Sequence, residues 1–322
     1  MDNRLKFSIG IPAFKAEHLR DCIESILNQD YTNFELIIVN DFSPQPIEKI
    51  VLSYNDERIK YYKNDFNIGA ENVVTNWNRC LEKSTSDYFV LMGDDDILEK
   101  NYLSEFDKLI RSFPNLNVYH CRSLIIDEKS LGIELTPSNP QFESVLNNIW
   151  HRITEKRIQF LSDFVYKTSF LKLNGGFYFL PLAWASDDIT SYLAASINGI
   201  AHTEKVLFRY RRHSNNISST GKVDLKLKAI SMECDWILDF VSKKDFTNNE
   251  DMILKKNILA TLPKYKKKKI LYTLSESLSG NFLKGVFRLG VSYKIYKISL
   301  VEFLFICFNY LKSYQLKKGL KL

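Results

Sequence analysis

The first 120 residues alternate short apolar runs with segments of helical periodicity, and this alternation is the strongest constraint on the fold. Apolar runs with the length and composition of buried strands lie at 7–11, 34–39, 59–62, 87–92 and 118–121. Apolar residues recur at helical spacing over 19–27, 47–54, 73–81 and 103–113. This order predicts an α/β fold in which helices cover a mostly parallel sheet.

The rest of the chain divides into two stretches of different character. The pattern from 122 to 221 is hard to assign, except for a helix predicted over 187–198 and closed by Gly199. After Thr220 the chain becomes helical and lysine-rich, with 20 Lys and Arg against 9 Asp and Glu, whereas residues 1–220 hold 24 against 29. We therefore expect a main domain at 1–220 and a basic helical region at 221–322.

Composition and missing motifs exclude several classes of protein. The five cysteines show no C-x-x-C spacing, which argues against a disulfide framework or a zinc–thiolate site and favours a reducing compartment. We expect neither a secretory segment at the start nor a transmembrane helix, which needs about 18 consecutive apolar residues. No GxGxxG, GxxxxGK[ST], GxSxG or HExxH motif is present, which disfavours dinucleotide-binding Rossmann enzymes, P-loop NTPases, α/β-hydrolases and zincins.

Acidic residues follow two of the predicted strands. Asp41 comes directly after the strand at 34–39, and the three carboxylates of residues 94–96 follow the strand at 87–92. If these strands are parallel, both loops lie at the carboxyl edge of the sheet together with residues 11–14, which end the first strand. Ligands bind at that edge in such folds. Crowded carboxylates suit a hard divalent cation that also binds phosphate, or they form an exposed turn that caps the next helix. Asp41 either accepts a hydrogen bond from a base or ribose or forms an Asx turn.

Two further clusters are candidates for chemistry. Asp187 and Asp188 open the helix at 187–198, where they act either as capping residues or as a general base beside a cleft. The run FRYRRH at 208–213 combines Arg and His with aromatic residues. It suits phosphate binding, and an exposed edge strand with alternating charge is the alternative.

Together these segments resemble glycosyltransferase family 2. Residues 8–43 (SIGIPAFKAEHLRDCIESILNQDYTNFELIIVNDFS) are similar to the family's N-terminal pattern almost element by element, and the segments at 67–78 and 88–98 resemble its Asn-Gly turn and its DXD-type loop. The chain departs from the pattern where Asn40 and Gly93 replace two acids. The resemblance is strongest over about 5–115.

The resemblance implies a GT-A nucleotide-diphospho-sugar transferase fold, with a Rossmann-like mixed, mostly parallel sheet and a C-terminal helical extension. It implies a nucleotide-sugar-binding half at 1–97 and an acceptor half at 98–220. It further implies that the donor contacts Pro12, Ala13, Phe14, Asp41, Asn67, Gly69, Asp94, Arg212 and His213. Mn²⁺ or Mg²⁺ would bind at Asp95 and Asp96, and the catalytic base would be Asp187, with Asp188 as the alternative.

The implied activity is inverting, metal-dependent hexosyl transfer from a nucleotide-diphosphate sugar, with UDP as the expected nucleotide. The acceptor would be a hydroxyl of a glycan or lipid-linked glycan in bacterial surface polysaccharide synthesis. The main alternative is a non-catalytic sugar-nucleotide-binding or scaffold protein with the same fold. A sugar-1-phosphate nucleotidyltransferase should carry a Gly-rich N-terminal loop, which residues 9–14 do not form.

The basic C-terminal region supports three interpretations. Its lysines are mixed with long apolar side chains, which fits the anionic inner face of the cell membrane better than nucleic acid. A helical cap packed on the catalytic domain and a homo-oligomer contact are the alternatives. We therefore expect a cytoplasmic protein, with peripheral membrane binding as one interpretation of the tail.

Overall fold

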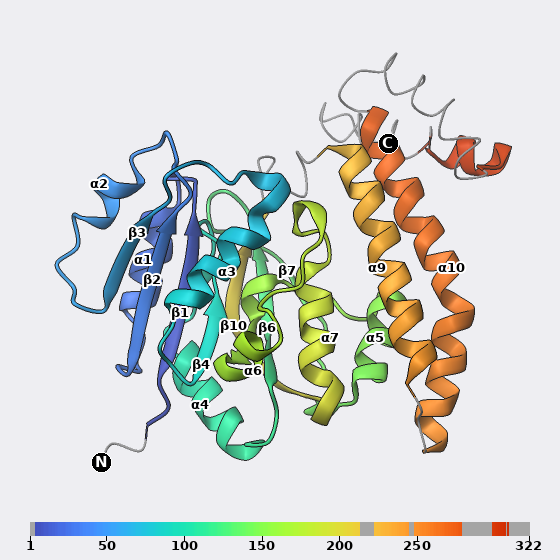
Figure 1. Ribbon diagram of the computed structural model, residues 1–322, viewed down its shortest axis with the longest axis horizontal. Helices are drawn as coiled ribbons and strands as arrows, with labels where there is room; N and C mark the ends of the chain where they lie inside the picture. The colour runs from blue at the N-terminus through green and yellow to red at the C-terminus, as the bar shows by residue number, and fades with distance from the viewer. Residues whose placement is uncertain (1–3, 213–221, 245–247, 279–297, 307, 309–322) are drawn as a thin grey trace. The chain divides into compact units, whose positions relative to one another are not determined.

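The computed structural model describes residues 4–212, 222–244, 248–278, 298–306 and 308, which form two compact units divided between Thr220 and Gly221 (Figure 1). The helices are α1 (Leu19–Leu27), α2 (Ile47–Val51), α3 (Val73–Lys83), α4 (Tyr102–Ser112), α5 (Val145–Ile153), α6 (Thr168–Leu173), α7 (Ser186–Asn198), α9 (Val223–Lys243) and α10 (Asn249–Leu278). Three short 3₁₀ turns are η1 (Ala70–Asn72), η2 (Leu161–Asp163) and η3 (Pro181–Ala183).

The described strands of the first unit form one ten-stranded sheet. They are β1 (Phe7–Ala13), β2 (Phe34–Asn40), β3 (Ile59–Lys63), β4 (Tyr88–Leu91), β5 (Ile97–Leu98), β6 (Val118–Ile126), β7 (Gly132–Leu135), β8 (Phe142–Glu143), β9 (Phe164–Lys167) and β10 (Ile200–Arg211). The order is β3-β2-β1-β4-β9-β6-β10-β5, with β7 paired to β6 and β8 to β10. The expected mixed, mostly parallel sheet is therefore confirmed.

Strand direction decides which loops meet at one edge. β1 is parallel to β2 and β4, and β2 is parallel to β3. β9 is antiparallel to both β4 and β6, so β6 and its parallel partner β10 run in the same direction as β4. The loops that follow β1, β2, β3, β4, β6 and β10 therefore all leave the carboxyl edge of the sheet.

The predicted helical periodicities correspond to helices that bury one face. Leu19, Cys22, Ile23 and Ile26 of α1 are buried and pack with residues of α2 and α4 against one face of the central strands. α3 packs on the other face, against β1, β2 and β4. This two-sided cover explains why β2 is buried along its whole length.

The second unit is a helical hairpin in which α10 packs along α9. Glu233 of α9 is buried and accepts hydrogen bonds from the Tyr265 hydroxyl at 2.7 Å and the Lys269 ammonium at 2.5 Å. Lys266 pairs with Asp235 at 3.1 Å, and Lys267 with Glu302 at 3.3 Å. Part of the lysine-rich run therefore holds the helices together.

Candidate functional site

Asp94 joins the loops that follow β1 and β4. Its Oδ2 accepts hydrogen bonds from the backbone N–H groups of Phe14 and Lys15, both at 2.7 Å. Burial and the neighbouring charge of Asp95 raise the pKa of Asp94 to about 6. The expected meeting of Phe14 with the acidic triplet at one edge is thus observed.

The other two acids of the triplet have different surroundings. Asp95 is partly exposed, and its Oδ2 lies 3.2 Å from the Lys15 ammonium. Asp96 is buried and accepts a hydrogen bond from the backbone N–H of Arg211 at 2.8 Å. Burial and the charge of Asp95 raise the pKa of Asp96 well above its usual value. Asp96 therefore points toward the protein interior, whereas Asp95 faces the edge of the sheet.

The acidic triplet fits a cation that is completed by its substrate. Within the described ranges, no three His, Cys, Asp or Glu side chains converge in a preformed metal cage. Mg²⁺-type sites commonly use one or two carboxylates, with phosphate oxygens and waters as the other ligands. The raised pKa values of Asp94 and Asp96 show crowded negative charge, which a divalent cation at Asp95 would offset.

Asp41 organises the loop that follows β3. Its Oδ1 accepts hydrogen bonds from Asn64 Nδ2 and the Ile68 N–H, both at 2.9 Å. Its Oδ2 accepts from the Gly69 N–H at 3.1 Å and from Asn67 Nδ2 at 3.2 Å. These four donors match the roughly four lone-pair positions of a carboxylate. In this structure Asp41, Asn67 and Gly69 form one hydrogen-bonded turn.

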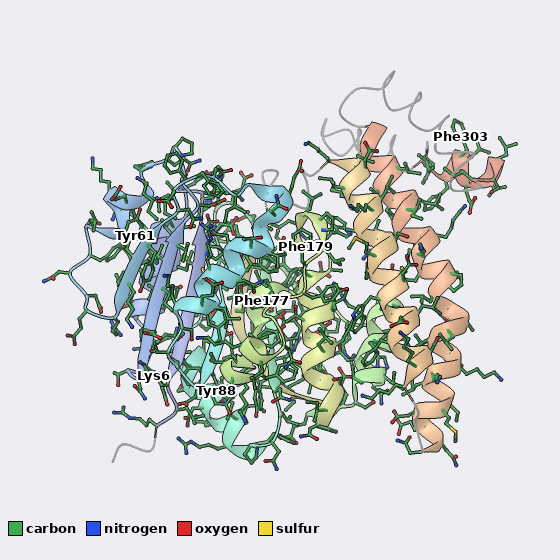
Figure 2. All side chains as sticks on the ribbon, viewed as in Figure 1. Lys6, Tyr61, Tyr88, Phe177, Phe179 and Phe303 are labelled. Carbon is green, nitrogen blue, oxygen red and sulfur yellow. The ribbon has the colours of Figure 1, made fainter. Side chains whose placement is uncertain are left out.

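That turn lies beside the chain that leads to Asp187. Gly69 precedes η1, and η1 packs against η3. The loop before η3 is fixed by Phe177, whose ring lies 5.7 Å from those of Trp77 and Tyr166 (Figure 2). Its backbone N–H also donates to Asn78 Oδ1 at 2.8 Å. The turn formed by Asp41, Asn67 and Gly69 and the start of α7 therefore lie close together.

The backbone just before Asp187 is strained. Leu182, Ala183 and Ala185 have φ angles of 60°, 52° and 70°, values that residues with a side chain rarely adopt. Such strain persists only where the surrounding structure holds it, and it is concentrated at functional sites. Here it turns the chain sharply into α7, whose first turn carries Asp187 and Asp188.

The two acids at the start of α7 differ in their partners. Asp188 is buried, and its oxygens lie 3.0 and 3.1 Å from Nε of Arg152 on α5. Asp187 is partly exposed, and burial together with the charge of Asp188 raises its pKa to about 7. Asp188 is thus paired with Arg152, whereas the raised pKa of Asp187 suits a general base at neutral pH.

The remaining predicted donor residues lie at or near the same edge. Pro12 and buried Ala13 end β1, and the Ala13 carbonyl accepts from the Asp41 N–H at 2.9 Å. Arg212 follows β10, and its half-exposed side chain lies 3.9 Å from Glu134. His213 is outside the described residues.

The edge-strand alternative for 208–213 is wrong for the part of this run that lies in β10, residues 208–211. β10 pairs with β6 along one side and with β5 and β8 along the other, and Arg211 is fully buried. An edge strand would leave one row of backbone groups unpaired. The alternating charge of this run therefore reflects partners on both sides of an interior strand.

Sequence reasoning did not single out two residues that contact the acidic triplet. Lys15 was not among the expected site residues, although a cation next to Phe14 was a signal for an acidic partner. Arg211 lay within the quoted basic run, but Arg212 and His213 were chosen instead. Nothing in the sequence distinguishes a buried arginine from its exposed neighbour.

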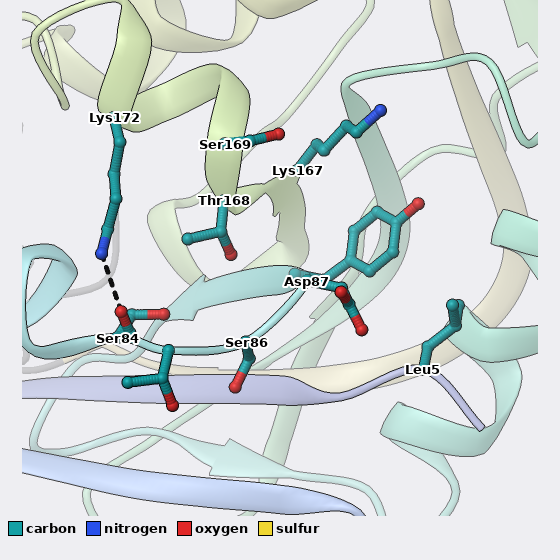
Figure 3. Close-up of a pocket in the computed structure, with 10 residues that line it drawn as sticks. Leu5, Ser84, Ser86, Asp87, Lys167, Thr168, Ser169 and Lys172 are labelled. Carbon is teal, nitrogen blue, oxygen red and sulfur yellow. Dashed lines mark hydrogen bonds between the residues drawn. The ribbon is translucent and has the colours of Figure 1, made fainter. Parts of the chain in front are cut away.

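A cavity of about 450 Å³ lies at the opposite edge of the sheet, lined by residues 84–88, 167–169, Leu5 and Lys172 (Figure 3). Several of its polar groups already have partners, although the buried Thr168 Oγ1 has no hydrogen-bond partner among the described residues. The Lys172 ammonium donates to the Ser84 carbonyl at 2.7 Å, and Thr85 donates from N and Oγ1 to Glu35 at 2.9 and 3.0 Å. The cavity therefore belongs to the structural support of β4.

Comparison with known proteins finds relatives that are named as glycosyltransferases. WcaA of Escherichia coli K12, a putative colanic acid biosynthesis glycosyl transferase, is 32% identical over 148 residues, which is 44% of this chain and 52% of WcaA. Escherichia coli WfgD, a UDP-Glc:alpha-D-GlcNAc-diphosphoundecaprenol beta-1,3-glucosyltransferase, is 28% identical over 151 residues, which is 46% of this chain and 57% of WfgD. The alignments thus span about half the length of these relatives.

Solved structures share the fold. Residues 1–349 of Staphylococcus aureus TarS in complex with UDP-GlcNAc superpose with a TM-score of 0.61 at 18% identity, covering 92% of this chain and 77% of the TarS chain. The family model for glycosyl transferase family 2 matches residues 8–168. That match takes in β1 through β9, with the acidic triplet and the Asp41 turn. Since it spans half of the chain, the protein belongs to glycosyltransferase family 2.

Proposed function

We propose that the protein is an inverting glycosyltransferase that moves a sugar from a nucleotide-diphosphate donor to an acceptor hydroxyl. One observation carries the proposal. The strand directions bring an acidic triplet suited to a cation and a diphosphate to the carboxyl edge, and the packing of η1 on η3 links that edge to the start of α7, where Asp187 has a pKa raised to about 7 that suits a general base. We take 1–220 as the catalytic unit.

Asp187 is the better of the two candidate bases. A base must be able to reach the hydroxyl and to hold its proton at working pH. Asp188 is buried against Arg152, so protonating it would break an ion pair. Asp187 is partly exposed, and burial together with the charge of Asp188 raises its pKa to about 7 despite the opposing charge of Arg152.

Each part of the site then has a task. A divalent cation, bound by Asp95, would supply charge stabilisation for the leaving diphosphate. Asp94 holds the β1 and β4 loops together, and Asp41 shapes the 67–69 turn that borders the donor. Asp187 takes the proton of the attacking hydroxyl. A single displacement inverts the anomeric centre, so one base is enough and no covalent sugar–enzyme bond is required.

The relatives suggest the substrates. TarS was solved with UDP-GlcNAc, and WfgD is named for transfer from UDP-Glc to a diphosphoundecaprenol-linked sugar. We therefore propose a UDP-hexose donor and a lipid-linked glycan acceptor, in the synthesis of a bacterial surface polysaccharide. The non-catalytic alternative has no observation in its favour, since the acidic triplet and the acid pair are both in place.

The test is ligand-dependent thermal stability. The wild-type protein is heated with UDP, GDP, TDP or CMP, each with Mn²⁺ and with EDTA. A nucleotide present at about 100 times its Kd adds roughly 2.7 kcal/mol of stability, so one nucleotide should raise the Tm, and more so with Mn²⁺. Asp95→Asn should lose the metal-dependent part and Asp187→Asn should keep it. No shift with any nucleotide would reject donor binding by the isolated protein.

We also propose that the C-terminal region contacts an anionic membrane surface. Residues 300–306 are helical and leave Leu300, Val301, Leu304 and Phe308 exposed at 59–75%, while the region carries an excess of basic residues. Basic amphipathic segments bind such surfaces. No helix in the described ranges is long and apolar enough to span a bilayer.

Liposome co-sedimentation of the full chain tests this surface. Leu304→Glu should weaken binding to vesicles containing anionic lipid. Leu238→Glu is the matched control, because Leu238 is 48% exposed on α9 outside this segment. Equal binding of both variants would reject the 300–308 segment as the contact.

A further inference from the structure

Arg211 is the largest fully buried side chain among the described residues. It ends β10 at the carboxyl edge, directly behind the acidic triplet. A buried guanidinium is tolerated only when its charge is offset and its donors have acceptors. Its contacts therefore show which parts of the protein depend on it.

Arg211 donates to two loops at once. Its backbone N–H donates to Asp96 Oδ1 at 2.8 Å and its Nε donates to the Asp95 carbonyl at 2.7 Å. Its Nη1 donates to the carbonyls of Asp127 and Glu128, both at 3.2 Å, and to Ser130 Oγ at 3.0 Å. One side chain thus links the acidic loop after β4 to the turn between β6 and β7.

The geometry suits an arginine and not a lysine. A guanidinium is planar and presents five donors in fixed directions, whereas an ammonium is a flexible point charge. The acceptors lie at different nitrogens of the guanidinium. The Asp95 carbonyl is at Nε, and the 127–130 turn is at Nη1. Because Arg211 holds the main chain of Asp95 itself, it fixes the direction in which the Asp95 carboxylate leaves the backbone.

We propose that Arg211 is a positioning residue that sets the Asp95 carboxylate for the cation and diphosphate and couples that loop to the β6–β7 turn. This inference rests on the proposed function. By linkage, a cation that orders the acidic loop must also order residues 127–130, and loss of the fork must weaken both effects.

The experiment compares three variants with wild type. Arg211→Lys keeps the charge and removes the fork. Arg209→Lys is the control on the same strand, where an exposed arginine pairs with Glu99 at 2.5 Å. Ser130→Gly removes one acceptor and relieves a φ of 64°, so it tests the link without disturbing the core.

Two readouts separate positioning from simple stability. Mn²⁺ affinity is measured by titration followed by electron paramagnetic resonance, and UDP affinity is measured in EDTA. We expect Arg211→Lys to bind Mn²⁺ at least tenfold more weakly and Ser130→Gly two- to fivefold more weakly. Arg209→Lys should match wild type, and UDP affinity in EDTA should change less than threefold in all variants.

Hydrogen exchange then tests the coupling. Mn²⁺ with UDP should slow amide exchange at 127–131 in wild type and in Arg209→Lys, but not in Arg211→Lys. A lower Tm with unchanged Mn²⁺ affinity and unchanged coupling would overturn the proposal and leave Arg211 as a core residue. If wild type bound neither Mn²⁺ nor UDP, the proposed function would fail instead, and the two failures are thus distinguishable.

Discussion

Replacing Asp187 by Asn should make the protein more stable at alkaline pH and leave its stability at acid pH unchanged. Folding raises the pKa of this carboxyl from 3.8 to about 7. A carboxyl with a raised pKa holds its proton more tightly in the folded state, so it disfavours folding increasingly as the pH rises from about 4 to about 7. The wild-type protein is therefore destabilised most above pH 7, where this carboxyl is ionised in the folded state.

The size of the effect on stability follows from that shift in the pKa of Asp187. Each tenfold change in an acid constant is about 1.36 kcal/mol. Coupling to Asp188 and the partial exposure of Asp187 reduce the full value, so we expect a gain of roughly 1–3 kcal/mol at pH 8.5. Asparagine has the same shape and no charge. At about pH 3, where this carboxyl is protonated in both the folded and the unfolded state, the two proteins should agree within about 0.5 kcal/mol.

Urea unfolding followed by tryptophan fluorescence at about pH 3 and pH 8.5 measures both values. Asp188→Asn is the matched control, since it removes the partner of Arg152 3.0 Å away. Removing the carboxylate beside that partly buried guanidinium should lower stability at pH 8.5 by roughly 1–3 kcal/mol. Asp187→Asn and Asp188→Asn should thus change stability at pH 8.5 in opposite directions.

Two outcomes would refute the reasoning. If Asp187→Asn and Asp188→Asn destabilised the protein alike at pH 8.5, Asp187 would be an ordinary helix-start acid. If the gain at pH 8.5 persisted at about pH 3, its cause would not be ionisation. The same pKa predicts that transfer by wild type falls about tenfold per pH unit below 7. Asp187→Asn should lower the rate about 10²–10⁴-fold at pH 8.

Three other substitutions test the supports of the site. Gly93→Ala places a Cβ 2.6 Å from Asp96 Oδ2, so it should cost about 1–3 kcal/mol in urea unfolding and weaken Mn²⁺ binding; unchanged Mn²⁺ affinity would contradict this. Asp41→Ala leaves four donors of the 64–69 loop without their acceptor, which should lower stability by about 2–4 kcal/mol; a loss below about 0.5 kcal/mol would show that water replaces the carboxylate. Burial by itself would raise the pKa of Glu143, but its bonds, chiefly those to His202 and Arg157, lower that pKa to about 2. The stabilising contribution of Glu143 is therefore present above about pH 4.5 and is lost toward pH 2. Glu143→Gln should therefore be destabilised at pH 7 and approach wild type near pH 2, and a pH-independent difference would argue against the ion pairs.

Most of the first half of the fold could be predicted from sequence. The periodicities at 19–27 and 73–81 became α1 and α3, and the apolar runs at 7–11 and 34–39 became β1 and β2. These elements follow from local spacing of apolar residues, which sequence contains directly. The predicted parallel sheet placed Phe14 near residues 94–96 before any contact was known.

The middle of the chain could not be predicted in the same way. β9 inserts between β4 and β6 and runs against both, a long-range pairing that has no local signature. The buried environment of Glu143 also depends on it indirectly, because β8 and β10 pair only once the sheet is assembled. Such partners are chosen by packing over large sequence separations.

The site shows the same division. The sequence by itself determined which residue types stand at the strand ends, because motif, spacing and alternation are local properties: Asp41, the acids at 94–96 and the pair at 187–188. The tertiary structure alone decided their states. In the folded protein Asp188 pairs with Arg152, and Asp187 has a raised pKa. Arg211 is buried, and its Nε donates to the Asp95 carbonyl. Proton affinity and hydrogen-bond partnership depend on burial and on charges brought together from distant segments, and no local pattern contains those distances.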